Sequence, residues 1–332
     1  MNATLDSISI VLVYSAIAVY TLAFVFFALD LGRRSAMKPA VGLAAAGSAA
    51  AVGTAQVRAA VGPGAGTAVL EKPAAPAREK ASPSLRVAIS LTVLGFVIHL
   101  AATIMRGFAA GRVPWANMYE FSLTMTLIVT AVFLGVLLKE DLRFLGTFVV
   151  GLVVILLGVS TVGFYVGVIP LPPALQSWWL VVHVFVASLA TGFFAIGFAL
   201  SVVQLLQSYR EGLSSELKQR KLRFLRSLPT AEHLENLAYR INIVGFIFWT
   251  FTLIAGAIWA ERAWGRYWGW DTKEVWTFII WVLYAGYIHA RATRGWRGSR
   301  SAWLAIIGFS AILFNYMVVN LVFKGLHAYS GL

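Results

Sequence analysis

Eight apolar stretches, each about as long as a membrane-spanning helix, occupy half of this chain of 332 residues. Hydrophobic residues make up 59% of the sequence and charged residues only 12%, a balance that excludes an ordinary soluble domain. A bilayer core requires about 20 apolar residues per helix, and only helices or closed barrels satisfy their backbone hydrogen bonds there. Because the stretches are long and do not alternate with polar residues, the sequence predicts an all-α, polytopic membrane bundle of about eight transmembrane helices. The predicted spans are 8–29, 87–105, 121–138, 144–166, 180–206, 241–260, 276–291 and 302–323.

The first predicted span is separated from the others by residues 35–86, which are rich in Ala, Gly and Pro. This composition is typical of a flexible linker, and the weak apolar patch at 39–52 contains too much Ala and Gly to span a membrane alone. The sequence therefore predicts an N-terminal transmembrane helix in residues 1–34, a cytoplasmic linker in 35–86 and a membrane domain in 87–332. A charged segment, Glu211–Arg226, carries leucines at helical spacing and predicts an amphipathic helix at the inner surface.

Positive charge is distributed unevenly over the connections between the predicted spans. The net charge is +13, and 21 of the 27 Lys and Arg lie in four alternating segments, 31–86, 139–143, 207–240 and 291–301. Lys and Arg collect in cytoplasmic loops, so we expect both termini to be extracytoplasmic in a multi-pass protein of the cell membrane. An excess with this topological origin indicates contact with a lipid bilayer and no nucleic-acid partner. The chain contains no cysteine, so metal or redox chemistry would need His, carboxylate or a bound cofactor.

One connection is unlike the others, and we call the segment Trp264–Trp276 the tryptophan loop. It holds four tryptophans, one tyrosine, two carboxylates and two cations between two apolar segments. Six of the twelve tryptophans fall between Trp259 and Trp281, whereas the interfacial belt of a plain solute transporter would scatter them. So many flat rings at one membrane face indicate a platform for a large flat ligand.

Two histidines are predicted to reach the face that carries the tryptophan loop. His183 lies at the extracytoplasmic end of the fifth predicted span, and His327 follows the eighth. Neutral imidazole is a good axial ligand for haem iron, and the aromatic loop would shield a porphyrin from water. The two histidines and the loop together predict a site where haem iron has His183 and His327 as axial ligands.

The remaining histidines have less specific surroundings. His289, near the inner end of the seventh span, is a candidate metal ligand because an ionisable group in a bilayer is costly, although its nearness to Arg291 also allows an interfacial role. His99, near the middle of the second span, is either functional or paired with a neighbouring helix. His233 is expected to be a solvated surface residue.

Charged residues around the tryptophan loop allow two interpretations each. Asp271, with Glu274 three residues later, either caps the seventh span or orients a histidine, and both roles are compatible. Arg262 and Arg266 match the geometry of haem propionates, but they are equally suited to pair with Glu261 and Asp271.

These residues resemble a known family. The segment from Gly256 to Arg291, with its core at 259–276, resembles the CcsA/ResC family of cytochrome c biogenesis proteins, which handle haem with a "WWD" domain. The resemblance covers roughly residues 90–332. It extends to three further segments, Asn117–Glu120, Pro173–His183 and Gly325–Tyr329.

The resemblance implies a function and a set of site residues. Members work with a ResB/CcsB-type membrane subunit as a cytochrome c synthase (haem lyase) of System II. The pair exports haem b and presents it outside for thioether attachment to the CXXCH motif of apocytochrome c. Carried over to this chain, the external axial ligands are His183 and His327, and His289 is a transmembrane haem ligand whose companion lies in the partner. The remaining haem-binding positions are Trp264, Trp268, Trp270, Asp271 and Trp276. No catalytic residue is implied beyond haem positioning, and His99 matches no family ligand.

The alternative function is a cytochrome b-like membrane electron-transfer subunit with a bis-His haem. Such proteins place paired histidines inside the bilayer on facing helices. Here the two strongest candidates are predicted at the outer rim beside an exposed loop, which favours haem presentation.

Overall fold

The computed structural model describes residues 2–37, 82–214, 222–323 and 325–327. All regular structure in these ranges is helical, which confirms the all-α prediction. The α-helices are α1 (Ala3–Met37), α3 (Pro83–Ala110), α4 (Met118–Leu137), α5 (Gly146–Gly163), α6 (Trp178–Glu211), α8 (Ala231–Trp264), α9 (Thr272–Arg294), α10 (Ser299–Phe314) and α11 (Asn320–Val322). Tighter or wider turns are η1 (Arg143–Leu145), η2 (Pro173–Leu175), η3 (Arg223–Ser227) and the π-helical η4 (Asn315–Val319).

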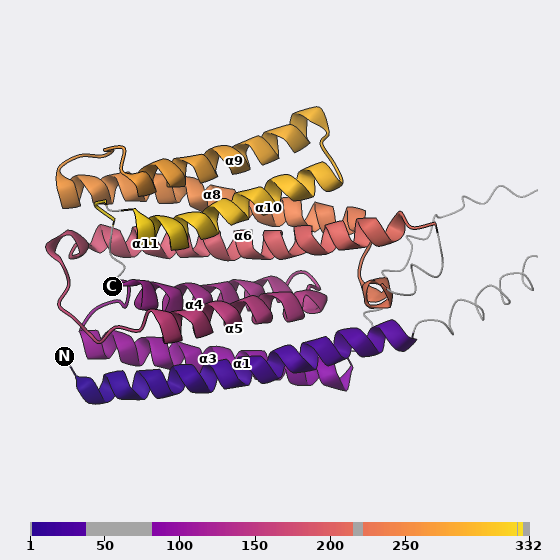
Figure 1. The fold of residues 1–332 in the computed structure, drawn as a ribbon, viewed down its shortest axis with the longest axis horizontal. Coiled ribbons are helices and arrows are strands. Elements are labelled where there is room, and N and C mark those ends of the chain that lie inside the picture. The colour runs from indigo at the N-terminus through magenta and orange to yellow at the C-terminus, as the bar shows by residue number, and fades with distance from the viewer. Residues whose placement is uncertain (1, 38–81, 215–221, 324, 328–332) are drawn as a thin grey trace, which may run out of the picture.

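Seven helical segments in the described part of the chain are long and apolar enough to cross a membrane, and each contains one of the predicted spans almost entirely. The exception is the predicted span 276–291. It forms α9, a helix of 23 residues, but its apolar stretch between Glu274 and His289 is short and contains Trp, Tyr and Gly. Figure 1 shows α9 running along α8 and α10. The eighth helix therefore exists where it was predicted, without the composition of a lipid-facing span.

The bundle is built around two extensively packed helix pairs, α1 with α3 and α6 with α8. Helix α4 contacts α3, α5 and α6 and so joins the pairs, while α9 and α10 pack beside α6 and α8. The close approach of α1 to α3 depends on Gly95, where a Cβ atom would lie 2.7 Å from the ring of Tyr20. The N-terminal helix is thus part of the bundle.

The ends of the predicted linker are helical, because α1 continues to Met37 and α3 begins at Pro83. The rest of the linker, including the apolar patch at 39–52, lies outside the described residues. The predicted amphipathic helix Glu211–Arg226 is also only partly described. The first residue of this predicted helix, Glu211, is the last residue of α6. The end of the predicted helix, from Arg223 to Arg226, lies in the 3-10 turn η3.

Helix boundaries follow local capping chemistry. Side-chain oxygens at the N-caps accept backbone N–H groups of the first turn, which have no partner within the helix; these caps are Ser82, Asn117, Ser177, Thr230 and Asp271. Three helices end at a glycine with positive φ, Gly111, Gly265 and Gly295. Gly265 ends α8 and begins the turn that carries the tryptophan loop.

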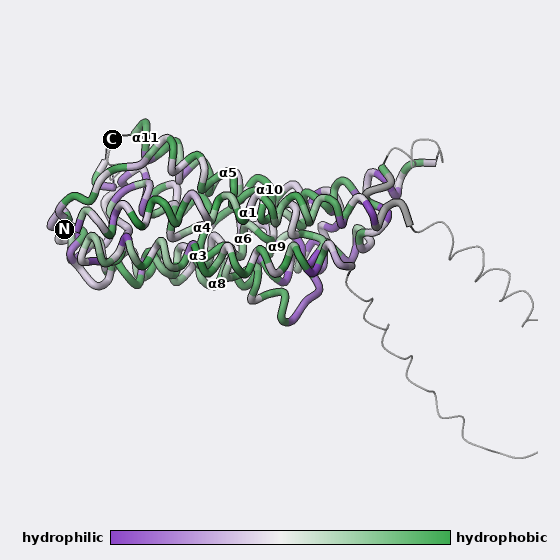
Figure 2. The backbone as a smooth tube through the Cα atoms, turned by 90° about the horizontal axis from the view of Figure 1, so that it is seen from below, coloured by the Kyte–Doolittle hydropathy of each residue, from purple (hydrophilic) through white to green (hydrophobic). Residues whose placement is uncertain are grey.

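The start of α1 and helix α11 lie at the same end of the bundle as the tryptophan loop, and we call this the loop end (Figure 1). The connection between α9 and α10, with Arg297, lies at the opposite end. Hydrophobic residues line the middle of the bundle, and hydrophilic residues gather toward its ends (Figure 2). In the described part of the chain, the start of α1, the tryptophan loop and α11 therefore share one end, as the alternation of predicted spans requires.

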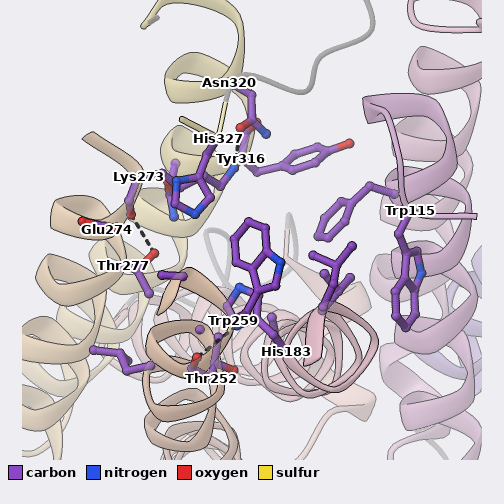
Figure 3. Close-up of a pocket in the computed structure, with 18 of the residues that line it drawn as sticks. Trp115, His183, Thr252, Trp259, Lys273, Glu274, Thr277, Tyr316, Asn320 and His327 are labelled. Carbon is purple, nitrogen blue, oxygen red and sulfur yellow. Dashed lines mark hydrogen bonds between the residues drawn. The ribbon is translucent and has the colours of Figure 1, made fainter. Parts of the chain in front are cut away.

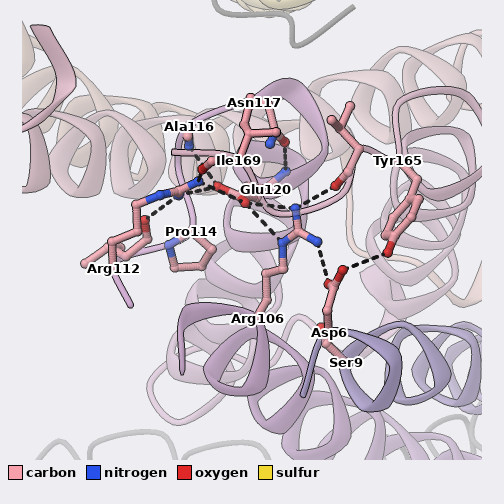
Figure 4. A network of polar contacts seen from close by, with 12 residues as sticks. Asp6, Ser9, Arg106, Arg112, Pro114, Ala116, Asn117, Glu120, Tyr165 and Ile169 are labelled. Atoms are coloured by element: carbon pink, nitrogen blue, oxygen red, sulfur yellow. Dashed lines mark hydrogen bonds and ion pairs between the residues drawn. The ribbon is translucent and has the colours of Figure 1, made fainter. Parts of the chain in front are cut away.

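A buried ion network fixes the loop end of the N-terminal half (Figure 4). Arg106 of α3 and Glu120 of α4 are fully buried, and Arg106 Nη2 lies 2.9 Å from Glu120 Oε1. Arg106 also pairs with Asp6 of α1 at 2.5 Å and donates to the Val166 carbonyl at 2.6 Å. Arg112 contacts the other Glu120 oxygen at 2.6 Å. Two cations and two carboxylates thus balance one another and tie α1, α3, α4 and the connection after α5 together.

Replacing Glu120 with Gln should destabilise the fold strongly. The change keeps the shape of the side chain but leaves the buried guanidinium of Arg106 with only Asp6 as an anionic partner and the half-buried Arg112 with none of the described carboxylates. Removing one member of a buried ion pair typically costs about 3–5 kcal/mol. Arg240→Gln is a matched control, because it removes an exposed pair with Glu140 that should contribute at most about 1 kcal/mol. Denaturant unfolding in detergent micelles measures both; equal stability of the two variants would contradict a structural role for the network.

Candidate functional site

An apolar pocket of about 190 Å³ lies at the loop end between α4, α6, α8, α9 and η4 (Figure 3). Clefts lined by aromatic residues with a few convergent polar groups are typical ligand sites. Two histidines, His183 and His327, and one cation, Lys273, line this pocket. Its aromatic wall consists of Trp115, Phe121, Trp249, Trp259, Tyr267, Trp268 and Tyr316.

His183 lies in the second turn of α6 and is held against α8. Its Nδ1 is 3.1 Å from the carbonyl oxygen of Thr252. A carbonyl only accepts, so Nδ1 carries the proton and Nε2 of the neutral ring keeps a free lone pair. The helices approach closely enough for this contact because position 256 is glycine, where a Cβ atom would lie 2.8 Å from His183 Cε1.

His327 follows α11 and is held by a carboxylate. Its Nδ1 is 2.7 Å from Asp271 Oδ2, which again directs the proton to Nδ1 and leaves Nε2 available. Neither Nε2 atom has a hydrogen-bond partner among the described residues. Metal-ligating histidines almost always donate their other N–H to a backbone carbonyl or a carboxylate. Both imidazoles therefore have the partner, and the tautomer, of a metal ligand.

The indole of Trp259 brings the two imidazoles into one neighbourhood. Its ring stacks on His183 with a centroid distance of 5.8 Å and an interplanar angle of 11°, and it meets the edge of His327 at 5.4 Å. Trp264 contacts His327 at 4.8 Å and Trp259 at the same distance. The Trp259 side chain is almost fully buried, and its N–H donates to the Ala174 carbonyl. The orientation of this indole is thus fixed by contacts on several sides.

Asp271 performs both roles that its sequence position allowed. It is the N-cap of α9, and its backbone N–H donates to Glu274 Oε2 at 3.0 Å in a capping box. Its side chain also accepts the backbone N–H of Leu326 at 3.0 Å, in addition to the His327 contact. The preceding residue, Trp270, has φ +60, a left-handed conformation that bulky residues rarely adopt and that commonly marks functional sites.

The hydrogen bond from His327 lowers the pKa of the Asp271 carboxyl to about 2, although partial burial opposes the shift. The carboxylate is therefore ionised at all physiological pH values. Because its pKa lies below the ordinary 3.8, its contribution to stability is fully present above that value and is lost only as the pH falls toward 2. The acceptor for His327 thus persists through mildly acidic solution.

Polar residues of α9 and of the segment around η4 also line the pocket beside His327. The Lys273 ammonium donates to Asn320 Oδ1, and Asn320 Nδ2 donates to the Tyr316 carbonyl at 2.8 Å. The Tyr316 hydroxyl bonds Ser122 of α4. Burial lowers the pKa of Lys273 from 10.5 to about 8, while the Asp271 carboxylate opposes this shift. Residues 315–319 form the π-helical turn η4, a feature that frequently occurs at functional sites.

The structure brings together five of the residues predicted for the site, namely His183, His327, Trp264, Trp268 and Asp271. The other three lie apart. Trp270 is 77% exposed and meets only the edge of Trp268 among the described aromatic rings. Trp276 packs on Phe314, with ring centroids 4.4 Å apart. His289 is exposed on the surface of α9, away from the pocket.

The other histidines occupy ordinary environments. His99 is fully buried, and its Nε2 lies 2.9 Å from the Leu123 carbonyl of α4. It therefore pairs with a neighbouring helix. His233 is exposed in the first turn of α8, as expected for a surface residue.

The two arginines of the tryptophan-loop region pair with carboxylates of the chain. Arg262 is exposed and lies 3.4 Å from Glu261, and Arg266 lies 3.8 Å from Glu274. The carboxylate partner of Arg266 is thus Glu274 and differs from the Asp271 that the sequence suggested. Both arginines adopt the salt-bridge alternative.

Known proteins are similar to this chain over most of its length. The family described as Cytochrome C assembly protein matches residues 115–327. Cytochrome c biogenesis protein CcsA of Trieres chinensis is 31% identical over 275 residues, covering 73% of this chain and 88% of the relative. CcsA of Guillardia theta is 36% identical over 242 residues, covering 68% of this chain and 80% of that relative. The chain belongs to the CcsA family.

Two further similarities cover less of the matched protein. CcsA of one strain of Prochlorococcus marinus is 44% identical over 177 residues, which are 48% of this chain and 56% of that relative. The solved structure of Cytochrome c Heme Lyase CcmF superimposes on 93% of this chain with a TM-score of 0.56 and 17% identity, and the match spans 46% of the lyase. Because the identity to the lyase is only 17%, this similarity demonstrates a shared fold alone.

Sequence reasoning missed several pocket residues of this CcsA-family protein. Thr252, Gly256 and Trp259 are four and three residues apart, which places them on one face of α8. That spacing, together with a glycine in an apolar helix, was the available signal for the wall that holds His183. Lys273 and Asn320 gave no such signal, because their contact joins segments that are distant in sequence.

Replacing Asp271 with Asn should weaken metal ligation by His327 and leave the fold intact. Asn is an equally good N-cap, so α9 should still form, but the charged acceptor that fixes the His327 tautomer is lost. Loss of such a partner typically lowers metal affinity about 10–100-fold. Absorbance titration with haem, the ligand expected from the sequence, measures the effect. Asp141→Asn, an exposed change beside Arg143, serves as control; equal haem affinity in the two variants would contradict the assigned role.

Replacing Gly256 with Ala should displace the His183 imidazole, because the added Cβ meets His183 Cε1 at 2.8 Å. We expect haem affinity to fall about tenfold or more, since a ligand misplaced by even 1 Å loses much of its function. Gly286→Ala in α9 is the matched control, because nothing lies within 4 Å of its added Cβ. That variant should bind haem normally; a Gly256→Ala protein that does the same would show that the close contact is dispensable.

Proposed function

We propose that this chain, together with a ResB/CcsB-type membrane subunit, forms a cytochrome c synthase that exports haem and presents it outside the cytoplasm. There the haem vinyl groups form thioethers with the two cysteines of CXXCH in apocytochrome c. The observation that carries the proposal is the pair of imidazoles, His183 and His327, packed against the same indole with Nδ1 engaged and Nε2 available. Membership of a family named for cytochrome c biogenesis supports it.

The residues of the pocket fit a haem substrate chemically. Iron porphyrins accept neutral imidazole on the metal, and both candidate ligands have a partner on Nδ1 that fixes the required tautomer. The surrounding wall is mostly aromatic and apolar, which suits a large flat ring and excludes water. The described residues contain no group of three or more His, Asp or Glu side chains that could hold a free metal ion, so the two histidines are better suited to a metal that arrives inside a porphyrin.

In this proposal the protein acts mainly by positioning. His183 and His327 hold haem b through its iron, and the pocket wall keeps the ring in one orientation. The bound haem supplies the vinyl groups, and the apocytochrome supplies both thiols, because this chain contains no cysteine. Holding three components together converts their encounter into a templated reaction, which lowers the entropic part of the barrier. The histidine of CXXCH would displace one imidazole as product forms and thereby weaken the hold on it.

The proposed orientation places the loop end outside the cytoplasm. The positive-inside rule supports it, because 21 of 27 Lys and Arg lie in the segments between the other ends of the helices. His289 belongs to the other half of the membrane domain and is exposed on α9. We propose that it ligates haem during export with a companion from the partner subunit, since exposure of an imidazole within a bilayer is costly without one.

The proposal is tested with the chain purified together with its neighbouring ResB-like protein. Wild-type complex should show a haem spectrum of low-spin, bis-imidazole character. His183→Ala and His327→Ala should each reduce retained haem by about tenfold or more, and His289→Ala should remove a separate haem population. His233→Ala, an exposed change at the opposite end of α8, should have no effect.

External imidazole provides a second readout for axial ligation. His183→Gly and His327→Gly should regain haem binding in part when imidazole is added, because free imidazole can occupy the space left by the side chain. Complete indifference of both variants to imidazole would argue against axial ligation. Stoichiometric haem that cycles reversibly, with c-type cytochromes intact in a deletion strain, would instead indicate an electron-transfer subunit.

A further inference from the structure

Lys273 is unusual among the cations at the loop end. The four arginines in the described part of this end all have carboxylate partners: Arg106, Arg112, Arg262 and Arg266. Lys273 also lines the pocket, yet it forms no ion pair with any described residue, and its hydrogen-bond acceptor is the neutral amide of Asn320. The pocket therefore contains a cation that lacks a salt-bridge partner within the described chain.

The surroundings hold this ammonium in place. Asn320 Nδ2 donates to the Tyr316 carbonyl, so its Oδ1 must face Lys273. An ammonium has three donors, and one of them is occupied by Asn320. The two carboxylates nearest in sequence have other partners. Asp271 is committed to His327, to Leu326 and to the cap of α9. Glu274 accepts the backbone N–H groups of Gly269 and Asp271 and pairs with Arg266. At least one donor remains for a ligand.

A desolvated ammonium without a paired counter-ion is costly, and the depressed pKa of Lys273 has this origin. A carboxylate brought by the ligand would remove the cost and form a charge-assisted hydrogen bond. The alternative donors for such a group, Arg262 and Arg266, are paired with Glu261 and Glu274. Among the described cations of this end, Lys273 is the best placed to bind an anion in the pocket.

We propose that Lys273, oriented by Asn320, binds a propionate carboxylate of haem in this pocket. The inference rests on the proposed function and adds the residue that sets the orientation of the ring. Propionates and vinyl groups occupy different edges of the porphyrin, so anchoring one edge at the first turn of α9 determines where the reactive edge points. The same turn begins at Asp271, which holds the axial candidate His327. The first turn of α9 and its N-cap thus hold the axial candidate His327 through Asp271 and orient the haem ring through Lys273.

The test compares haem with its dimethyl ester, in which both propionates are neutral. Each is titrated into the purified complex with the ResB-like protein, and affinities are read from absorbance. A hydrogen bond to a charged group is stronger than one between neutral groups, so wild-type complex should prefer haem over the ester by about tenfold or more. Lys273→Gln should weaken haem binding by the same factor and leave ester binding unchanged. Lys273→Arg should keep the preference, because the charge remains.

Arg262→Gln is the matched control, since it removes an exposed cation of the same end that is already paired with Glu261. It should bind haem and ester as the wild type does. Three results would overturn the inference: no preference for haem in the wild type, an equal loss of both ligands in Lys273→Gln, or a preference that survives this change. If wild-type complex binds neither ligand, the proposed function itself is wrong and the role of Lys273 falls with it.

Discussion

The arrangement of the loop end depends on one carboxylate. Asp271 caps α9, accepts the backbone N–H of Leu326 and bonds His327 Nδ1. It therefore joins the tryptophan loop, the start of α9 and the described residues 325–327 after α11, which form no helix that could position a histidine. The absence of a side chain at Gly325 is part of the same arrangement, because an added Cβ would collide with Asp271. A pocket with His327 in its wall exists because one side chain satisfies three partners.

A second charged cluster supports the other side of the pocket. Glu120, the third residue of α4, is held by Arg106 and Arg112, and α4 contributes Met118, Phe121 and Met125 to the pocket wall. Buried ion pairs seldom increase stability compared with apolar packing, so their value here is geometric. They fix the first turn of α4 against α1 and α3, whereas Asp271 fixes α9 against the C-terminal segment. The pocket lies between these two fixed regions.

The sequence predicted the helices well and the pocket only in part. Long apolar runs specify membrane helices almost independently of tertiary context, and Asp271 and Glu274 are a local capping signal that the structure reproduces. His183 and His327 were paired through their predicted position at one membrane face. Trp259 and Lys273 were not selected, because their roles arise from contacts with His183 and Asn320, which are distant in sequence. Conversely, the sequence could not separate Trp270 and Trp276 from the other tryptophans of the loop, because all share one residue type. Trp270 is exposed, and Trp276 packs on Phe314.

Helix α9 explains why the predicted and observed counts of membrane spans differ. Its first turn carries Lys273 and Glu274 and its last turns carry His289 and Arg291, so its apolar stretch is shorter than that of the other long helices. Polar groups at a bilayer boundary have an energetic cost unless they are bonded, and three of these four have partners in the chain: Asn320, the capping backbone and Glu235. The exception among the described contacts is the His289 ring. Helix α9 thus carries a pocket residue, Lys273, in its first turn and the proposed export ligand, His289, near its other end. These polar groups are why its composition departs from the lipid-facing pattern.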